Sequence, residues 1–303
     1  MRTRLLITVS LLMALVIFST APIHAQAQPL KVVATFSILG DVVHAIAADK
    51  IDLTVLVGAD GDTHSYEPVP QDSVALTDAN LIFENGLGFE SWLDDLFTAA
   101  GGQAQRVVVS QGINPGKISV GDETGETDPH IWQNPYNYVR VAELVRDTLS
   151  AADPTNAVTY QLNANAYITQ LLDADTYVLQ QVQKLPADQR KLVTNHDAFG
   201  YFASRYGLEI VGTALGSVST EGANGSAANI AKLVEDIRTT GARAIFAENI
   251  ENADVVTQIA QEAGVKVGAP LCSDALTPVD GPCPTYLQMI HYNIDSIVSA
   301  LTS

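Results

Sequence analysis

Short hydrophobic runs rich in β-branched residues alternate with longer amphipathic stretches along most of the chain. The runs that predict strands form two sets, residues 31–36, 51–57, 80–84 and 106–110, and residues 191–194, 208–212, 243–247 and 265–267. Between them, hydrophobic positions three or four residues apart predict helices at 40–48, 88–99, 227–239 and 253–263. Such alternation is typical of parallel βαβ units, so we expect two α/β lobes with about four strands each.

A long helical pattern separates the two sets of strands. Hydrophobic residues recur at three-to-four spacing from Pro154 to Leu185, with no glycine inside this stretch. One helix of about 30 residues would be about 45 Å long and would join the lobes stiffly. Two shorter helices broken near residues 173–175 are the alternative. We therefore expect a signal peptide at 1–27, an N-terminal lobe at 28–153, a linking helix at 154–185 and a C-terminal lobe at 186–303.

The first 27 residues have the order of a secretory signal peptide. Arg2 and Arg4 precede an apolar run from Leu5 to Phe18, and small residues lead to Ala27, where we expect cleavage. The run is shorter than the roughly 18 to 20 apolar residues of a spanning helix. Neither cysteine of the chain follows it closely enough to carry a lipid. We expect a protein exported across the cytoplasmic membrane, with an uncleaved N-terminal anchor as the alternative.

The strongly negative net charge of the chain limits the kinds of molecule that it is expected to bind. The chain carries a formal net charge of −18, and removing the signal leaves 14 basic against 34 acidic residues. Such a charge opposes nucleic acid and anionic membranes as partners and favours solubility. We expect a monomer.

Two cysteines, Cys272 and Cys283, lie close together near the C-terminus. In an exported protein a disulfide is the expected state of such a pair. A pair of metal thiolates is the competing interpretation, but it would require a closer spacing or further cysteines. We therefore predict a disulfide.

Three of the six histidines occur where binding groups gather. His24 belongs to the signal segment, whereas His44 and His291 lie in helical patterns, where packed or surface histidines are ordinary. The others are His64, His130 and His196, which follow strands or lie in loops. Ligands of open α/β sheets gather at the carboxyl ends of strands, so two facing lobes would aim these side chains into one cleft. Three imidazoles form a donor set suited to Zn²⁺.

The segment around His130 is unusually stiff for a loop. It reads Asp128-Pro-His-Ile-Trp-Gln-Asn-Pro135. The prolines fix φ on both sides of the histidine, and the tryptophan ring can bury itself against the lobe. Metal-bound histidines also need a partner for their other ring nitrogen, which Asp62, Asp128 or backbone carbonyls could provide.

A fourth ligand should be an acidic residue near a strand end of the second lobe. Asp274 and Glu248 both qualify. A bridge between Cys272 and Cys283 would restrict the loop that contains Asp274 by roughly 3 kcal/mol on the chain-entropy model. We therefore favour Asp274 and keep Glu248 as the second choice.

Six short motifs are distributed along the mature chain: Asp62-Thr-His-Ser-Tyr-Glu-Pro68, Asn85-Gly-Leu-Gly-Phe-Glu-Ser-Trp-Leu93, Asp128-Pro-His-Ile-Trp132, His196-Asp-Ala-Phe-Gly-Tyr-Phe-Ala203, Ile245-Phe-Ala-Glu248 and Ser273-Asp274. With them the sequence resembles the periplasmic solute-binding proteins of ABC importers for zinc and manganese. The resemblance implies two α/β lobes joined by one long helix, a metal ion at their interface, and delivery to a membrane permease. It places the ligands at His64, His130, His196 and Asp274. From its position after a strand, Glu248 stays an alternative ligand or a residue behind the ligands.

The resemblance also bears on the metal. Manganese binders of this family often carry glutamate at the third ligand position, whereas zinc binders usually carry histidine, so His196 favours Zn²⁺ with Mn²⁺ as the alternative. Mn²⁺ also prefers oxygen-rich sites and lies low in the affinity order of divalent metals. The chain departs from many zinc-binding members in one respect, because its acidic loop at 121–128 contains no histidine.

An enzyme is the contrasting class. A zinc hydrolase would hold its metal with three protein ligands and an open water position, and Glu248 or Asp197 could then act as the base. The chain has neither an H-E-x-x-H nor a G-x-S-x-G motif. We therefore predict a binding protein without enzymatic activity, whose metal affinity falls steeply below about pH 6 because histidines must lose their protons to coordinate.

Overall fold

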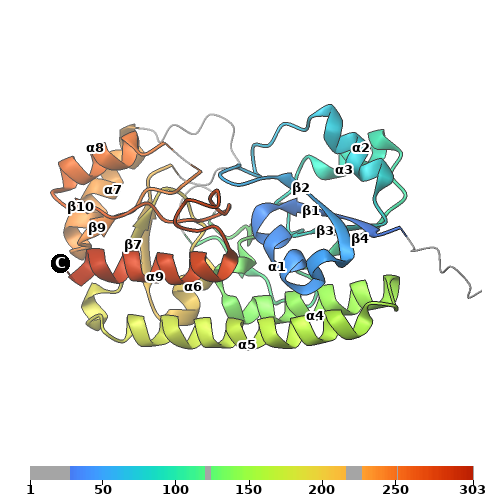
Figure 1. The fold of residues 1–303 in the computed structure, drawn as a ribbon. Coiled ribbons are helices and arrows are strands. Elements are labelled where there is room, and N and C mark those ends of the chain that lie inside the picture. Colours follow the sequence, from blue (N-terminus) through green and yellow to red (C-terminus); the bar gives the residue numbers. More distant parts are fainter. Residues whose placement is uncertain (1–27, 120–123, 216–226, 251, 303) are drawn as a thin grey trace, which may run out of the picture.

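The computed structural model describes residues 28–119, 124–215, 227–250 and 252–302. The expected signal peptide at 1–27 and part of the acidic loop at 121–128 lie outside the described residues. Across the described ranges the helices and strands form two α/β lobes above one long helix (Figure 1).

The first lobe is built on a parallel sheet in the order β2-β1-β3-β4. Its strands are β1 (Leu30–Phe36), β2 (Ile51–Val57), β3 (Leu81–Glu84) and β4 (Gln105–Val108). Alternate residues of β1 enter different cores: Val32 belongs to the large core with α1 (Ser37–Ala47), and Val33 to a smaller one with α2 (Pro70–Asp78) and α3 (Leu93–Ala100). Burial on both faces explains why β1 and β3 are almost entirely hydrophobic, whereas β2 and β4 at the edges of the sheet carry polar residues at exposed positions.

The long helix α5 runs without a break from Ala157 to Val182. It lies beneath both lobes and packs on α1, on α4 (Pro135–Ala152) and on α9 (Tyr286–Thr302) (Figure 1). The helix is shorter at both ends than the predicted range of 154–185, and the alternative of two helices broken near residues 173–175 is wrong. Asp175 stays buried within the helix because its carboxylate accepts a hydrogen bond from Arg205 at 2.6 Å.

In the part of the second lobe that the structure describes, four short strands form two parallel pairs. The pairs are β7 (Lys191–Thr194) with β8 (Glu209–Thr213), and β9 (Ala244–Ile245) with β10 (Lys266–Val267). The Phe246 N–H donates to the Val193 carbonyl at 2.9 Å and joins the pairs. The strand expected at 243–247 is thus only two residues long. The helices of this lobe are α6 (Gly200–Tyr206), α7 (Ala227–Thr240), α8 (Asp254–Ala263) and α9.

Three helices and one hairpin have no counterpart among the predicted elements. They are α2, α4, α6 and the small antiparallel hairpin of β5 (Gly116–Lys117) and β6 (Thr127–Asp128). The helix expected at 88–99 begins only at Leu93, because Gly86, Leu87 and Gly88 adopt positive φ angles of 78°, 59° and 84° that a right-handed helix cannot contain.

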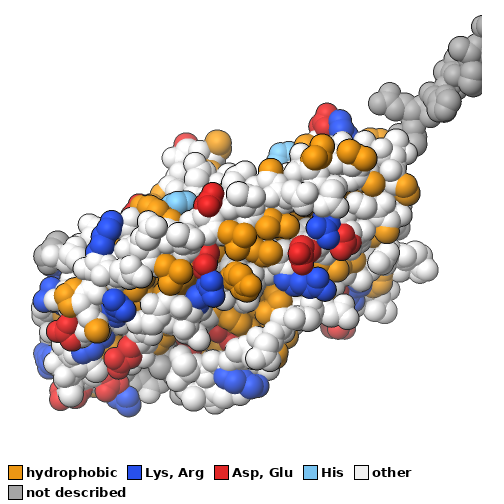
Figure 2. Space-filling model, turned by 90° about the horizontal axis from the view of Figure 1, so that it is seen from below, with side chains coloured by type: hydrophobic (Ala, Val, Ile, Leu, Met, Phe, Trp, Pro, Cys, Tyr) orange, Lys and Arg blue, Asp and Glu red, His pale blue; other side chains and the backbone are white. Residues whose placement is uncertain are grey.

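The underside of the molecule is a solvent-exposed helical face. Figure 2 shows hydrophobic side chains there, separated by scattered charged ones. On α5, Val158 is 73% and Leu162 is 63% exposed, whereas its opposite face is buried against both lobes. Within the described ranges, no helix combines the length and the hydropathy needed to cross a membrane.

The predicted disulfide between Cys272 and Cys283 is confirmed. Both cysteines are buried, and they close the loop between β10 and α9. The disulfide therefore holds the two ends of this loop together.

Candidate metal centre

Among the described residues, His64, His130, His196 and Asp274 each offer one donor atom, and these atoms all lie within 4.8 Å of one another. Nε2 of His64 lies 3.3 Å from Nε2 of His130 and 3.3 Å from Oδ2 of Asp274. Oδ2 of Asp274 also lies 3.0 Å from Nε2 of His196 and 3.8 Å from Nε2 of His130. Side chains spread over 210 positions of the sequence therefore surround one small volume.

Each of the four residues lies in a loop or turn that follows a strand. His64 lies in the loop after β2, and His196 follows β7 directly. His130 ends the β5–β6 hairpin and starts a short 3₁₀ turn, Ile131–Gln133. Asp274 lies in the disulfide-closed loop before α9. For His64 and His196 the position follows from the parallel strands β2 and β7, whose carboxyl ends face the space between the lobes, whereas His130 and Asp274 reach the same space from loops.

Asp274 is the single carboxylate of the cluster. It is fully buried, and burial alone would raise its pKa, but His196 and His130 hold the pKa well below its usual range. The carboxylate is therefore ionised. Its second oxygen, Oδ1, has no hydrogen-bond partner among the described residues. A buried anionic oxygen without a partner is costly unless a cation or water approaches it, so the cluster is suited to a divalent metal ion.

Two carboxylates lie behind His130 and His196, each beside the Nδ1 atom of one ring. Nδ1 of His130 lies 2.7 Å from Oδ1 of Asp128, and Nδ1 of His196 lies 2.6 Å from Oε2 of Glu248. Both rings thus turn Nε2 toward Asp274. Burial lowers the pKa of each histidine, but the surrounding carboxylates outweigh it, so the pKa of His130 is raised and that of His196 is raised well above its usual range.

Of the acidic residues expected near the site, Asp128 contacts a histidine ring, whereas Asp62 accepts a hydrogen bond from the backbone N–H of His64 at 2.9 Å. Glu248 lies on the Nδ1 side of His196, away from the four donor atoms. Its other oxygen accepts the backbone N–H groups of Asn195 and His196, at 2.9 and 3.0 Å.

Two aromatic rings, those of Phe89 and Trp132, pack beside the histidines of the site. The ring of Phe89 meets that of His64 edge-on at 4.8 Å and that of Trp132 at 4.7 Å. The loop that carries Phe89 is held by Glu90, whose carboxylate accepts from the Asn85 N–H at 2.7 Å. Burial raises the pKa of Glu90 to about 7. The motif of residues 85–93 can be recognised in the sequence. The role of Phe89 within it depends on contacts with other segments, which the sequence does not show.

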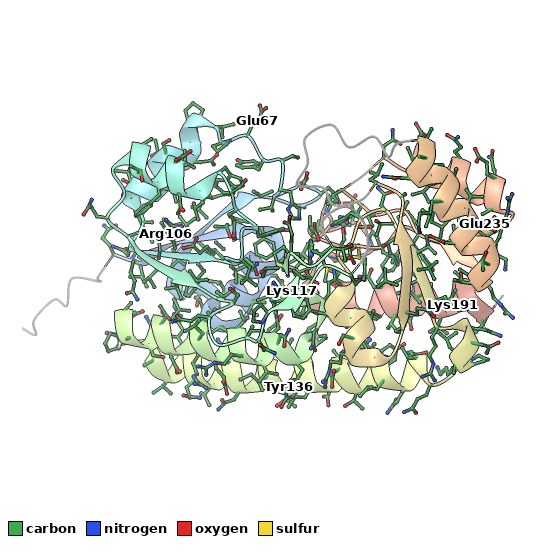
Figure 3. All side chains as sticks on the ribbon, turned by 180° about the vertical axis from the view of Figure 1, so that it is seen from behind. Glu67, Arg106, Lys117, Tyr136, Lys191 and Glu235 are labelled. Carbon is green, nitrogen blue, oxygen red and sulfur yellow. A yellow bond between two sulfur atoms is a disulfide. The ribbon has the colours of Figure 1, made fainter. Side chains whose placement is uncertain are left out.

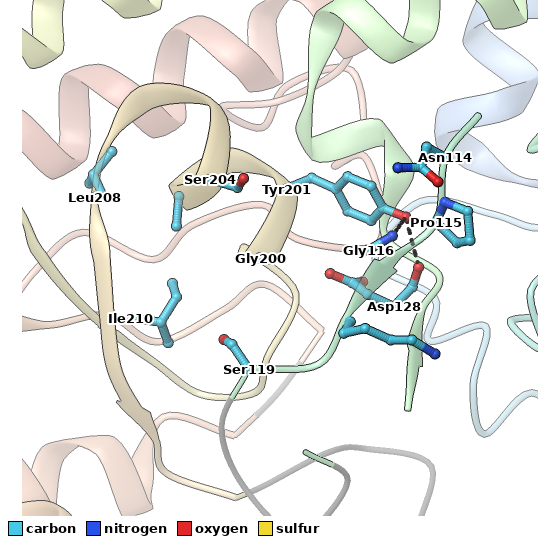
Figure 4. Close-up of a pocket in the computed structure, with 12 residues that line it drawn as sticks. Asn114, Pro115, Gly116, Ser119, Asp128, Gly200, Tyr201, Ser204, Leu208 and Ile210 are labelled. Atoms are coloured by element: carbon cyan, nitrogen blue, oxygen red, sulfur yellow. Dashed lines mark hydrogen bonds between the residues drawn. The ribbon is translucent and has the colours of Figure 1, made fainter. Parts of the chain in front are cut away.

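The β5–β6 hairpin joins the His130 segment to the second lobe. Tyr201 of α6 accepts a hydrogen bond from the Gly116 N–H at 2.8 Å and donates to the Asp128 carbonyl at 3.0 Å (Figure 4). The hairpin residue Lys117 lies near the middle of the molecule in the view from behind (Figure 3). The backbone N–H of Ser119 donates to Asp197 at 2.9 Å, so Asp197 has a structural contact beside the site.

Two histidines were expected outside the cluster. His44 is exposed on α1, and His291 of α9 packs against Tyr177 of α5. Neither belongs to the group of converging donors. His24 lies outside the described residues.

Comparisons with known proteins agree with this architecture. The family model described as "Zinc-uptake complex component A periplasmic" matches residues 32–300. The chain is 33% identical to the manganese-binding lipoprotein MntA of Halalkalibacterium halodurans, over 90% of this chain and 89% of that protein. It is 32% identical to the iron-binding protein YfeA of Yersinia pestis, over 89% of this chain and 86% of that protein.

Solved structures include close matches in fold. The periplasmic zinc-binding protein TroA of Treponema pallidum superposes with a TM-score of 0.81 and 33% identity, covering 90% of this chain and 99% of that one. A manganese-bound periplasmic protein of Candidatus Liberibacter asiaticus gives a TM-score of 0.80 and 30% identity, covering 90% and 100%. These relatives are binding proteins, which sets the hydrolase interpretation aside. The chain belongs to the family of the zinc-uptake complex component A, the periplasmic metal-binding receptors of ABC importers.

Proposed function

We propose that the protein captures Zn²⁺ between its lobes through Nε2 of His64, His130 and His196 and a carboxylate oxygen of Asp274. The observation that carries the proposal is the convergence of these four donor atoms within 4.8 Å. Asp128 and Glu248 support it, because each contacts the distal nitrogen of a histidine and leaves Nε2 directed inward. One carboxylate and three neutral imidazoles would leave the bound ion with a net charge near +1.

The donor set favours zinc on chemical grounds. Three imidazoles and one carboxylate complete the tetrahedron that Zn²⁺ prefers, and Zn²⁺ binds nitrogen donors more tightly than Mn²⁺ does. Mn²⁺ is the second candidate for a specific reason: the free Oδ1 of Asp274 offers a fifth donor to an ion that accepts more oxygen ligands. Relatives named for manganese and for iron fit this second candidate too.

Delivery to a permease follows from membership of the family. We propose that residues 28–153 and 186–303 act as two lobes around the ion and that α5 limits their relative movement. The protein would work as a monomer, and the capture step would not require the loop at 121–128, which has no histidine.

A competition titration tests the choice of metal. Protein stripped of metal is titrated with Zn²⁺ and with Mn²⁺ by calorimetry, and each metal is then used to displace the other. We expect one site per chain and tighter binding of Zn²⁺ than of Mn²⁺, in the direction of the affinity order. Equal affinities, or tighter binding of Mn²⁺, would contradict the zinc proposal and support the manganese one.

A further inference from the structure

The loop that carries Asp274 is hydrogen-bonded to the first lobe. The carbonyl oxygen of Ser273, the residue before Asp274, accepts from Nε1 of Trp132 at 2.7 Å and from Nε2 of Gln133 at 2.8 Å. Both donors belong to the 3₁₀ turn that directly follows His130. One carbonyl group therefore links the segments of two candidate ligands that lie 144 positions apart in the sequence.

This contact is sealed from water. Trp132, Gln133 and Ser273 are all 0% exposed. The turn is held in place from behind, because the Tyr286 hydroxyl donates to the Trp132 carbonyl at 2.5 Å. Since water cannot replace a lost donor there, removal of either side chain leaves a buried carbonyl with less compensation.

The clamped carbonyl belongs to the peptide group that joins Ser273 to Asp274. Fixing this group restricts the backbone from which the Asp274 side chain projects. On the other side, Cys272 is held by the disulfide and by Asn293, whose Oδ1 accepts the Cys272 N–H at 2.9 Å. The backbone on the N-terminal side of Asp274 is thus restrained by several contacts, which would reduce the conformational entropy that the carboxylate loses when an ion binds.

We propose that Gln133, together with Trp132, is a positioning residue that sets metal affinity by fixing the Asp274 carboxylate against His130. This inference rests on the proposed ligand role of Asp274. In the proposed role the clamp acts through the Asp274 carboxylate, so its effect on affinity depends on the presence of that carboxylate. A merely structural role would lower stability and would leave the same effect on affinity in any background.

The test is a double-mutant cycle on the full-length mature protein, with Zn²⁺ affinity measured by competition with a chromophoric chelator. The variants are Gln133→Met, Asp274→Asn and the combination of both. Gln133→Met removes the donor at similar volume, and we expect it to weaken binding about 3- to 10-fold, the worth of one buried hydrogen bond. In the Asp274→Asn background we expect no further loss. Gln180→Met, on the exposed face of α5, is the matched control and should change nothing.

The outcomes separate the two proposals. If Asp274→Asn weakens binding and Gln133→Met weakens it equally in both backgrounds, or not at all, the positioning role is overturned while the ligand set stands. If Asp274→Asn leaves affinity unchanged, the ligand set fails and this inference fails with it. Should Gln133→Met not fold, Trp132→Phe removes only the indole N–H of the same clamp, and the same cycle is read with that variant.

Discussion

His196 and Glu248 contact each other at two points. Nδ1 of the His196 ring lies 2.6 Å from Oε2 of Glu248, and the His196 backbone N–H donates to Oε1 at 3.0 Å. Both side chains are almost completely buried. Glu248 therefore holds the His196 backbone by a hydrogen bond and places a carboxylate oxygen beside Nδ1 of its ring.

Neutralising Glu248 should weaken the site without removing a ligand. In Glu248→Gln the negative charge behind the imidazole is lost, and we expect Zn²⁺ affinity to fall about 10- to 100-fold, as for other carboxylates that support metal-bound histidines. Calorimetric titration measures the change. Glu235→Gln, an exposed substitution on α7 (Figure 3), is the control. Equal affinities of the two variants would contradict the role of Glu248.

As pH decreases, metal affinity should begin to fall at a higher pH than the sequence alone predicts. The sequence predicts a loss below about pH 6, but the carboxylates raise the pKa of His130 and of His196 above the ordinary imidazole value of 6.5. Bound protons must therefore be displaced by the metal even near neutrality. We expect apparent affinity to rise with pH through 6.5 and beyond, and proton release on binding. Titrations between pH 5 and 8 with constant affinity would contradict the ligand set.

The same pKa shifts predict different pH trends for the stability of the metal-free and metal-loaded protein. A histidine whose pKa is raised on folding stabilises the fold below its unfolded pKa of about 6.5, and this contribution is lost as pH rises through the folded pKa. The metal-free protein should thus lose stability from about pH 6.5 upward. With Zn²⁺ in excess, tighter binding at higher pH offsets the loss. Thermal unfolding with and without metal measures the difference, and parallel curves would contradict it.

Two histidine substitutions should differ sharply. His196→Ala removes a donor from the cluster, and we expect Zn²⁺ binding to weaken by more than the roughly 10- to 100-fold of a supporting residue. His44→Ala changes an exposed side chain on α1 and should leave affinity unaltered. Titration of both variants beside the unmodified protein checks this, and similar losses would count against His196 as a ligand.

Opening the disulfide should affect both stability and the site. Replacing Cys272 and Cys283 by alanine frees the loop around Asp274, and we expect a loss of about 2 to 5 kcal/mol in the free energy of unfolding. Zn²⁺ affinity should fall too, because the carboxylate must then be ordered on binding. Chemical denaturation and titration measure the two effects. A stable variant with unchanged affinity would show that the Trp132–Gln133 clamp alone orders the loop.

The sequence predicts the strands well because their signals are local. The runs at 51–57 and 191–194 appear as β2 and β7 with the same bounds, since hydrophobic and β-branched residues dominate both. The hairpin of β5 and β6 has no such signal. Its two-residue strands are set by Tyr201, which is far away in the sequence.

The candidate site follows the same rule. His64, His130 and His196 could be singled out because each follows a strand or lies in a proline-stiffened loop. The role of Glu248 could not be decided, because Glu248 and Asp274 have similar local contexts, and only the folded arrangement places one behind a ring and the other among the donors. The contacts of Trp132 and Gln133 with Ser273 also depend on how the lobes pack.

X-ray absorption at the zinc edge of the metal-loaded protein tests the central claim most directly. Its fine structure reports the number and kind of donor atoms around the ion. We predict three imidazole nitrogens and one or two carboxylate oxygens at about 2.0 to 2.2 Å, with one imidazole lost in His196→Ala. A first shell with fewer than three imidazoles, or one unchanged by that substitution, would contradict the account.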